Sequence, residues 1–160
     1  MFIVCDTDFL SSFLKIDRLD LVKRLFKEEN LHIPRAVLLE LAKTNLIIKL
    51  LKLDWIKIEE IKEDLLNIFE DDEIKVLGEG EKECILLCKE KENSILLIND
   101  RKAREIAKRK GISTLNTSAF LLLCKIRGII GRDGIISLME SLKEKDYFEF
   151  TEEEKRILLE

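Results

Sequence analysis

Two short runs of consecutive apolar residues interrupt an otherwise helical pattern of hydrophobic and polar positions. The first covers residues 2–5 and is followed by Asp6, and the second covers residues 94–98 and is followed by Asn99 and Asp100. An unbroken apolar run of this length, closed by a polar residue, is typical of a strand buried on both faces of a parallel sheet. We therefore expect these runs to be central strands of an α/β domain.

Between and after these strands, apolar residues recur at helical spacing. We expect helices over residues 9–14, 19–26, 34–41, 46–53, 60–70, 81–91, 101–110, 118–127 and 132–144, and a terminal helix capped at Thr151. Asp17 is expected to cap the second helix, and shorter strands are expected at 31–33, 55–58 (an edge strand) and 112–115. Alternating strands and helices predict a three-layer α/β/α sandwich with a central, mainly parallel sheet. We expect one domain over residues 1–160, with 131–160 as a C-terminal helical extension.

Charge is abundant but nearly balanced, with 28 Lys+Arg against 32 Asp+Glu and a net charge of -4. This balance argues against a protein that coats nucleic acid with a uniformly basic surface, and against charged tails. No apolar run approaches the ~18 residues needed to span a bilayer. The first residues lack the basic stretch of a signal peptide, so we expect a cytoplasmic protein without a membrane segment.

The four cysteines, which are Cys5, Cys84, Cys88 and Cys124, all lie in apolar stretches. This placement favours buried, reduced thiols over a disulfide framework. Cys84 and Cys88 are one helical turn apart and could share a metal ion. No second cysteine pair accompanies them, however, and His32 is the only histidine, so a structural zinc site is not expected.

Acidic and amide side chains follow both predicted central strands. In an open parallel sheet, ligands bind beyond the carboxyl ends of the strands, where we expect Asp6, Asp8, Asn99 and Asp100. Converging carboxylates need a cation, and an oxygen cluster suits Mg²⁺ or Mn²⁺. The alternative is that each Asp only caps the helix that follows it. Glu40, Glu81 and Glu83 border apolar helix faces, where a glutamate is more often a solvated neighbour.

A dense basic stretch directly follows Asp100 and offers positive charge beside the expected acidic site. It contains Arg101, Lys102, Arg104, Lys108 and Arg109. Such a helix could bind the phosphates of RNA, or it could be an ordinary solvated face.

Four segments also carry a family resemblance. Residues 3–10 are a hydrophobic strand that runs into Asp-Thr-Asp-x-Leu, and residues 33–41 are a proline-started helix that delivers Glu40. Residues 80–85 read Gly-Glu-Lys-Glu-Cys-Ile, and residues 96–103 contain a strand that ends in Asn-Asp. In this order the segments resemble the four motifs of PIN-domain nucleases, and in particular an archaeal and bacterial branch similar to VapC-type toxin ribonucleases.

The resemblance implies a divalent-metal-dependent endoribonuclease, often the toxin of a toxin–antitoxin pair. By position it assigns an acidic quartet of Asp6, Glu40, Glu83 and Asp100 that binds Mg²⁺ or Mn²⁺, with Asp8, Glu81 and Asn99 in support. Whether Glu81 or Glu83 is the third acid stays open. Ile98 stands where the fourth motif often has Ser or Thr. The expected partners are RNA, an antitoxin protein, and a second copy of the chain that contacts residues 46–53.

Two other functions remain open from the residues. A PIN-like domain that has lost cleavage would act as an RNA-binding or scaffold module. A haloacid-dehalogenase-like phosphohydrolase would also fit residues 2–9, with Asp6 as the nucleophile. Residues 99–102 lack the Gly-Asp-x-x-x-Asp pattern expected later in that second family.

Overall fold

The computed structural model describes residues 1–62, 64 and 72–160. Its centre is a five-stranded sheet in the order β3-β2-β1-β4-β5, and every pair of neighbouring strands is parallel. The strands are β1 (Phe2–Cys5), β2 (Leu31–Pro34), β3 (Ile56–Glu59), β4 (Ser94–Leu97) and β5 (Ser113–Leu115). The two strands expected at the centre of the sheet, β1 and β4, are adjacent there.

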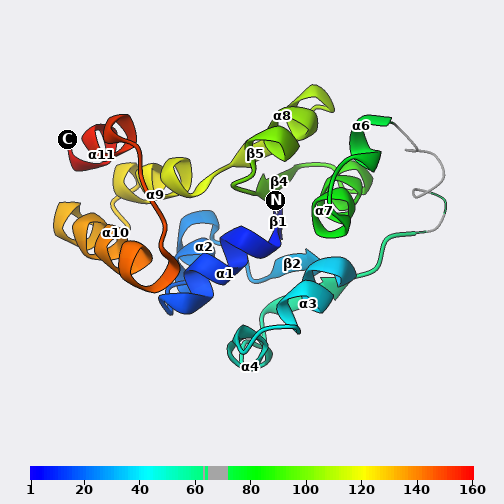
Figure 1. Cartoon of the computed structure of the whole chain (residues 1–160), viewed down its shortest axis with the longest axis horizontal. Coiled ribbons are helices and arrows are strands. Elements are labelled where there is room, and N and C mark those ends of the chain that lie inside the picture. Colours follow the sequence, from blue (N-terminus) through cyan, green and yellow to red (C-terminus); the bar gives the residue numbers. More distant parts are fainter. Residues whose placement is uncertain (63, 65–71) are drawn as a thin grey trace.

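Helices connect the strands, and three more follow the last strand, β5, in the described part of the chain. They are α1 (Thr7–Lys15), α2 (Asp20–Phe26), α3 (Arg35–Leu41), α4 (Leu46–Leu51), α6 (Asp72–Lys75), α7 (Glu79–Glu90), α8 (Arg101–Arg109), α9 (Thr117–Ile126), α10 (Arg132–Asp146) and α11 (Glu152–Leu159). Figure 1 shows α7 and α8 on one side of the sheet and α1, α2, α9 and α10 on the other. The predicted three-layer α/β/α sandwich is therefore confirmed, and its sheet is wholly parallel.

Three aromatic rings fix α1, which follows the first strand, against α9. Phe9 and Phe13 of α1 stack with their ring centroids 4.7 Å apart, and each meets Phe120 of α9 edge-on at 5.3 Å. All three side chains are fully buried. Rings packed in this way add to the free energy gained by burying their apolar surface. The start of α1 is therefore held firmly at the carboxyl end of β1.

Two details of the helix termini differ from the sequence prediction. Asp17 does not cap α2, because α2 begins after Leu19 and Asp17 instead forms an ion pair with Lys49 at 2.9 Å. The helix α7 begins at Glu79, so Gly80 lies in its first turn and does not precede it. The helix expected over residues 60–70 falls mainly on residues 63 and 65–71, which lie outside the described residues.

Other local predictions are confirmed. The Thr151 hydroxyl accepts a hydrogen bond from the Glu154 N–H, and the Glu154 carboxylate accepts one from the Thr151 N–H, so a capping box starts α11. All four cysteines are buried and free, and burial raises the pKa of each thiol. They are core residues with little thiolate character.

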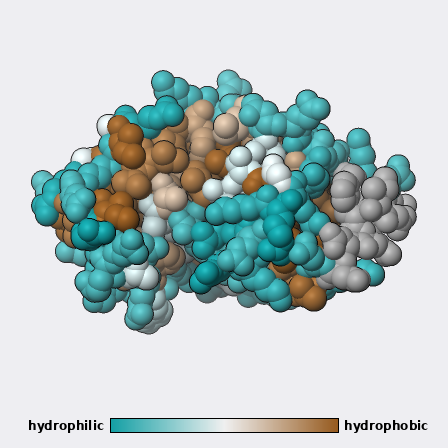
Figure 2. All heavy atoms as spheres, turned by 90° about the horizontal axis from the view of Figure 1, so that it is seen from above, coloured by the Kyte–Doolittle hydropathy of each residue, from teal (hydrophilic) through white to brown (hydrophobic). Residues whose placement is uncertain are grey.

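The surface is uneven in polarity. Figure 2 shows hydrophilic side chains over the part of the molecule where α8 lies and a more apolar area toward α9. Within the described part of the chain, no helix combines the length and apolarity that crossing a membrane requires.

Candidate metal and nucleic-acid site

The carboxyl ends of β1 and β4 lie side by side at the centre of the sheet. The Asp6 N–H donates a hydrogen bond to the Leu97 carbonyl at 3.0 Å and extends the pairing of the two strands by one residue. From β1 the chain proceeds to β2 and β3 on one side, whereas β4 leads to β5 on the other. This change of direction is the place where open α/β sheets bind ligands. The structure thus brings the polar ends of both predicted strands to one crevice.

Asp6 is a buried carboxylic acid at this point. Its side chain is only 4% exposed, and although it occupies the N-cap position of α1, it makes no capping hydrogen bond to a described residue. Burial is the main reason why the pKa of Asp6 rises to about 7. A hydrogen bond with the Thr7 backbone lowers this pKa, while the carboxylates of Glu81, Asp8 and Glu40 raise it. Ionising Asp6 is therefore costly unless a cation lies nearby.

Gly80 lies next to two of these carboxylates. A Cβ atom added to this residue would lie 2.5 Å from Oε1 of Glu40 and 3.5 Å from Oδ1 of Asp6. The two carboxylates, delivered by α3 and by the end of β1, therefore face the same point on the first turn of α7. Any side chain at Gly80 would collide with the Glu40 carboxylate. Gly80 is the first residue of the segment 80–85 that carries the family resemblance, but the sequence alone did not indicate that it contacts the carboxylates.

Glu81 and Glu83 lie two residues apart on α7 but have different neighbours. Burial raises the pKa of Glu81, and so do the carboxylates of Asp100, Asp8 and Glu40, whereas Lys102 lowers it. The side chain of Glu83 instead accepts a hydrogen bond from the Ala36 N–H at 2.9 Å, at the start of α3. Burial also raises the pKa of Glu83, but its charged neighbours are Glu79, Lys82 and Arg35. Glu81 therefore belongs to a group of interacting carboxylates, called the acidic group below, that also contains Asp6, Asp8, Glu40 and Asp100. Glu83 instead contacts the start of α3, the helix that carries Glu40.

The residues after β4 make structural hydrogen bonds. Asp100 caps α8, because its Oδ1 accepts a hydrogen bond from the Ala103 N–H at 2.8 Å. Oδ1 of Asn99 accepts hydrogen bonds from the Thr117 N–H at 2.8 Å and the Thr117 hydroxyl at 2.9 Å. Asn99 thereby joins the end of β4 to the start of α9. The alternative prediction of a helix cap holds for Asp100, whose charge nevertheless raises the pKa of Asp8 and Glu81.

Asp8 links the crevice to the end of α10. Burial raises the pKa of Asp8, as do the charges of Glu40, Asp146 and Asp100, and Lys15 opposes them. Asp146 accepts hydrogen bonds from the Ser12 hydroxyl at 2.5 Å and from Lys15 Nζ at 2.7 Å. This contact joins residues more than 130 positions apart. No local pattern in the sequence could have indicated it.

The basic helix α8 begins beside the acidic group. Arg101, Lys102, Lys108 and Arg109 are exposed, and Arg104 is partly buried. Arg101 pairs with Glu105 at 3.1 Å, and Arg109 pairs with Glu73 at 2.9 Å. Lys102 and Lys108 form no ion pair with a described residue, and Lys102 is close enough to lower the pKa of Glu81. These two lysines are the cations of α8 that are best placed to meet a further anion.

The oxygen donors of the crevice suit a hard divalent cation. As the side chains stand, no three His, Cys, Asp or Glu residues in the described ranges are close enough to form a complete set of metal ligands. Asp6 and Glu40 nevertheless face one point at Gly80, and Glu81 is near enough for its charge to raise the pKa of Asp6. Carboxylate oxygens are the donor type that Mg²⁺ and Mn²⁺ prefer. The hydroxyl of Thr7, next to Asp6, is buried without a hydrogen-bond partner among the described residues. The residues therefore fit such an ion.

Comparison with known proteins agrees with this arrangement. A family model described as a PIN domain matches residues 2–159. The chain belongs to the PIN-domain family. PIN domains are generally nucleases, so membership confirms the family predicted from the four motifs and supports an enzyme that hydrolyses nucleic acid. Among curated proteins, none was found to match.

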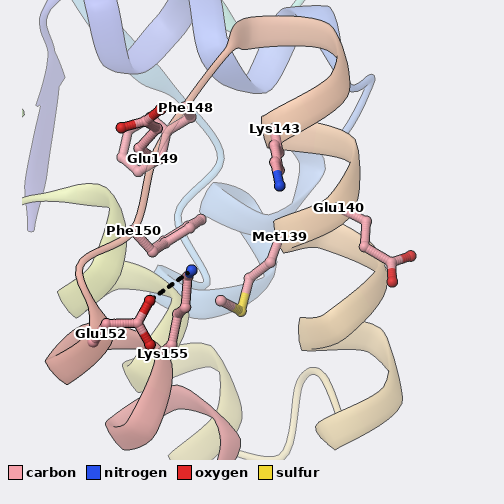
Figure 3. Close-up of a pocket in the computed structure, with 8 residues that line it drawn as sticks. All are labelled: Met139, Glu140, Lys143, Phe148, Glu149, Phe150, Glu152 and Lys155. Atoms are coloured by element: carbon pink, nitrogen blue, oxygen red, sulfur yellow. Dashed lines mark hydrogen bonds and ion pairs between the residues drawn. The ribbon is translucent and has the colours of Figure 1, made fainter.

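In the described part of the PIN domain, cavities of about 450 Å³ include one between α10 and α11 and one beside the end of α10. The first lies between α10 and α11, away from the acidic crevice. Figure 3 shows Met139, Phe148 and Phe150 on its walls, with an ion pair between Glu152 and Lys155 at one end. The second adjoins the crevice and includes Asp8 and Asn99 in its lining. Both cavities share Phe148 and Glu149, so the segment between α10 and α11 separates them.

Proposed function

We propose that this PIN domain is a divalent-metal-dependent ribonuclease that hydrolyses the phosphodiester bonds of RNA. The observation that carries the proposal is the convergence of Asp6 and Glu40 on Gly80, at the switch point of the sheet. Asp6 is buried there among like charges, an arrangement that lowers stability in the absence of a cation. A costly cluster of this kind is typical of a functional site.

Within this proposal, Asp6, Glu40 and Glu81 hold Mg²⁺ or Mn²⁺. Glu81 takes the place of the third acid because it shares the surroundings of Asp8, Glu40 and Asp100. Glu83, which the family resemblance placed in the quartet, supports the site indirectly through its hydrogen bond to Ala36.

The bound ion would supply an activated water and would neutralise charge on the phosphoryl oxygens. Asp100 adds negative charge at the crevice while it fixes the first turn of α8. Lys102, near Glu81, is placed to attract a phosphate of the RNA backbone, and Lys108 continues the exposed basic face of α8. Arg101, Arg104 and Arg109 extend this positive surface, although two of them also pair with glutamates.

The experiment is cleavage of end-labelled RNA by the purified protein in Mg²⁺ or Mn²⁺, compared with EDTA. Asp6→Asn should reduce the rate by at least about 100-fold, because a central metal ligand loses its charge. Ile126→Ala changes a side chain that is 67% exposed on α9 and serves as a matched control with the parental rate. Cleavage that persists in EDTA or in Asp6→Asn would contradict the proposal. Metal-independent RNA binding without cleavage would favour the scaffold alternative.

We further propose, from the resemblance to VapC-type proteins, that the nuclease acts in the cytoplasm as a toxin that an antitoxin protein neutralises, and that it forms a homodimer. Residues 46–53 remain the proposed dimer contact. Ile48 and Leu51 in this segment are 58% and 74% exposed, so an apolar surface is present there. Light scattering of the parent and of Leu51→Glu would test the dimer, which the substitution should dissociate.

A further inference from the structure

The cavity beside the acidic crevice is formed by segments from distant parts of the chain. Its lining includes Asp8 and Ser11 of α1, Asn99 after β4, and Tyr147 and Glu149 from the segment after α10. Its volume of about 450 Å³ lies in the range of small-ligand sites, which is roughly 300–1,000 Å³. Because Asp8 and Asn99 also border the crevice, a nucleotide chain that reaches the metal ligands could place its neighbouring unit in this cavity.

The charges in this cavity disfavour a phosphate. Lys15 is the cation among its lining residues, and it is already paired with Asp146 at 2.7 Å. The carboxylates of Asp8 and Glu149 remain, and Glu149 is exposed and makes no hydrogen bond or ion pair with the described residues. Carboxylates accept hydrogen bonds and repel anions. The cavity is therefore suited to a neutral group that carries N–H donors.

Tyr147 is a highly exposed aromatic residue in the lining of the cavity. It is the only tyrosine in the chain and is 87% exposed. Its backbone is left-handed, with φ at 53°, at the C-terminus of α10, a conformation that is unusual for a residue with a side chain. The next N–H, that of Phe148, donates a hydrogen bond to the Leu142 carbonyl at 3.1 Å. Phe148 also packs on Phe150, with ring centroids 4.8 Å apart. The exposed ring thus stands on a fixed backbone.

We propose that this cavity binds one nucleobase of the RNA substrate, stacked on Tyr147 and hydrogen-bonded to Glu149 through the exocyclic amino group of the base. The proposal rests on the proposed function, since it names a substrate subsite next to the same metal ligands. Unpaired RNA bases commonly stack on aromatic side chains and donate hydrogen bonds from their exposed edges. Adenine, guanine and cytosine carry an amino group, whereas the N3–H donor of uracil lies between two carbonyl oxygens, which a carboxylate repels. The subsite should therefore bind uracil most weakly.

The test measures binding without cleavage. Fluorescently labelled five-unit ribose-phosphate oligomers that carry a single A, G, C or U at the centre, and no base elsewhere, are titrated with the Asp6→Asn protein in Mg²⁺ buffer. An oligomer without any base is the reference. Tyr147→Ala should weaken binding of the base-bearing oligomers about tenfold. It should not change binding of the reference. Tyr147→Phe, which keeps the ring, should restore most of the affinity, and Glu149→Gln should remove the preference against U.

Ile126→Ala is the control for an exposed apolar side chain outside the cavity. The subsite is excluded if the Asp6→Asn protein binds base-bearing and baseless oligomers equally, or if adding Tyr147→Ala to Asp6→Asn changes the affinity for base-bearing oligomers by less than about twofold. Base-dependent binding through Tyr147 in a protein that does not cleave RNA would overturn the nuclease proposal alone. Metal-dependent cleavage together with unchanged binding by Tyr147→Ala would overturn the subsite alone.

Discussion

The two strand-to-helix junctions at the centre of the sheet look alike in sequence but differ in physical environment. At the β4–α8 junction, Asp100 is exposed and caps its helix, so its negative charge is stabilised by the backbone N–H of Ala103. At the β1–α1 junction, Asp6 is buried, caps nothing in the described structure and faces Glu40 and Glu81. The Asp100 junction contributes to stability, whereas the burial of Asp6 among like charges lowers the stability of the metal-free protein. The role of an aspartate after a buried strand therefore depends on its burial and on the groups that surround it in the folded protein.

In this comparison, the largest effect should be the loss of Mn²⁺ affinity in Gly80→Ala. This substitution alters the β1–α1 junction and leaves the β4–α8 junction unchanged. Gly80→Ala would push the Glu40 carboxylate away, since the new methyl group would lie 2.5 Å from its Oε1. We expect affinity for Mn²⁺ to fall about 10- to 100-fold, the usual range when the support of a metal ligand is lost. Calorimetric titration with Mn²⁺ measures this change. Gly78→Ala, with no atom within 4 Å of its added Cβ, is the matched control. Equal affinities in the two variants would contradict the role of Gly80.

The next effect concerns pH and the metal-free protein. The pKa of Asp6 is raised to about 7, mainly by burial, so the folded state holds this proton more tightly than the unfolded chain does. The stabilisation that the proton provides is complete below the unfolded pKa near 3.8 and is lost as the pH rises through about 7. Asp6→Asn, which stays neutral, should therefore raise the free energy of unfolding in EDTA near pH 8 by about 1–3 kcal/mol, and by less near pH 4.

Urea unfolding of the parent and of Asp6→Asn at both pH values measures this difference. A variant that is less stable than the parent near pH 8 would show that the Asp6 carboxylate is satisfied in the metal-free protein, and would remove the contrast with Asp100.

The smallest effect belongs to the β4–α8 junction. Asp100→Ala should lower the free energy of unfolding by about 1 kcal/mol, because the Ala103 N–H loses its capping acceptor. Asp100→Asn removes the charge but keeps an acceptor oxygen, so it should be clearly more stable than the alanine variant. Thermal unfolding of the two variants gives the comparison. If they unfold together, Asp100 does not act as a cap.

Much of this architecture follows from local pattern. The apolar runs at 2–5 and 94–98 predicted β1 and β4, and the polar residues behind them predicted the crevice, because parallel strands end at one edge of a sheet. The prediction that Asp17 caps α2 is wrong, because this residue forms an ion pair with Lys49, which is distant in sequence. The sequence predicts the start of α7 at residue 81, after Gly80, because glycine has a low helix propensity; the helix begins at Glu79 because packing overrides this weak signal.

The choice between Glu81 and Glu83 could not be made from sequence for a different reason. Both glutamates border the apolar face of α7, and spacing alone cannot show which of them meets another helix. Glu83 accepts a hydrogen bond from the Ala36 N–H at the start of α3, which lies more than 40 residues earlier in the chain. The contact of Asp146 with Ser12 spans an even longer stretch of sequence, 134 residues. Such pairings are fixed only when the elements pack.

The central claim is that Asp6, Glu40 and Glu81 form a divalent-metal site to which Glu83 contributes no ligand. Calorimetric titration with Mn²⁺ of the parent, Glu81→Gln and Glu83→Gln tests it most directly, since Gln keeps the size of the side chain and, at Glu83, an acceptor for the Ala36 N–H. We expect that the parent binds Mn²⁺, that Glu81→Gln binds it at least about tenfold more weakly, and that Glu83→Gln binds it like the parent. A parent that does not bind Mn²⁺, or a loss of affinity in Glu83→Gln with Glu81→Gln unchanged, would contradict it.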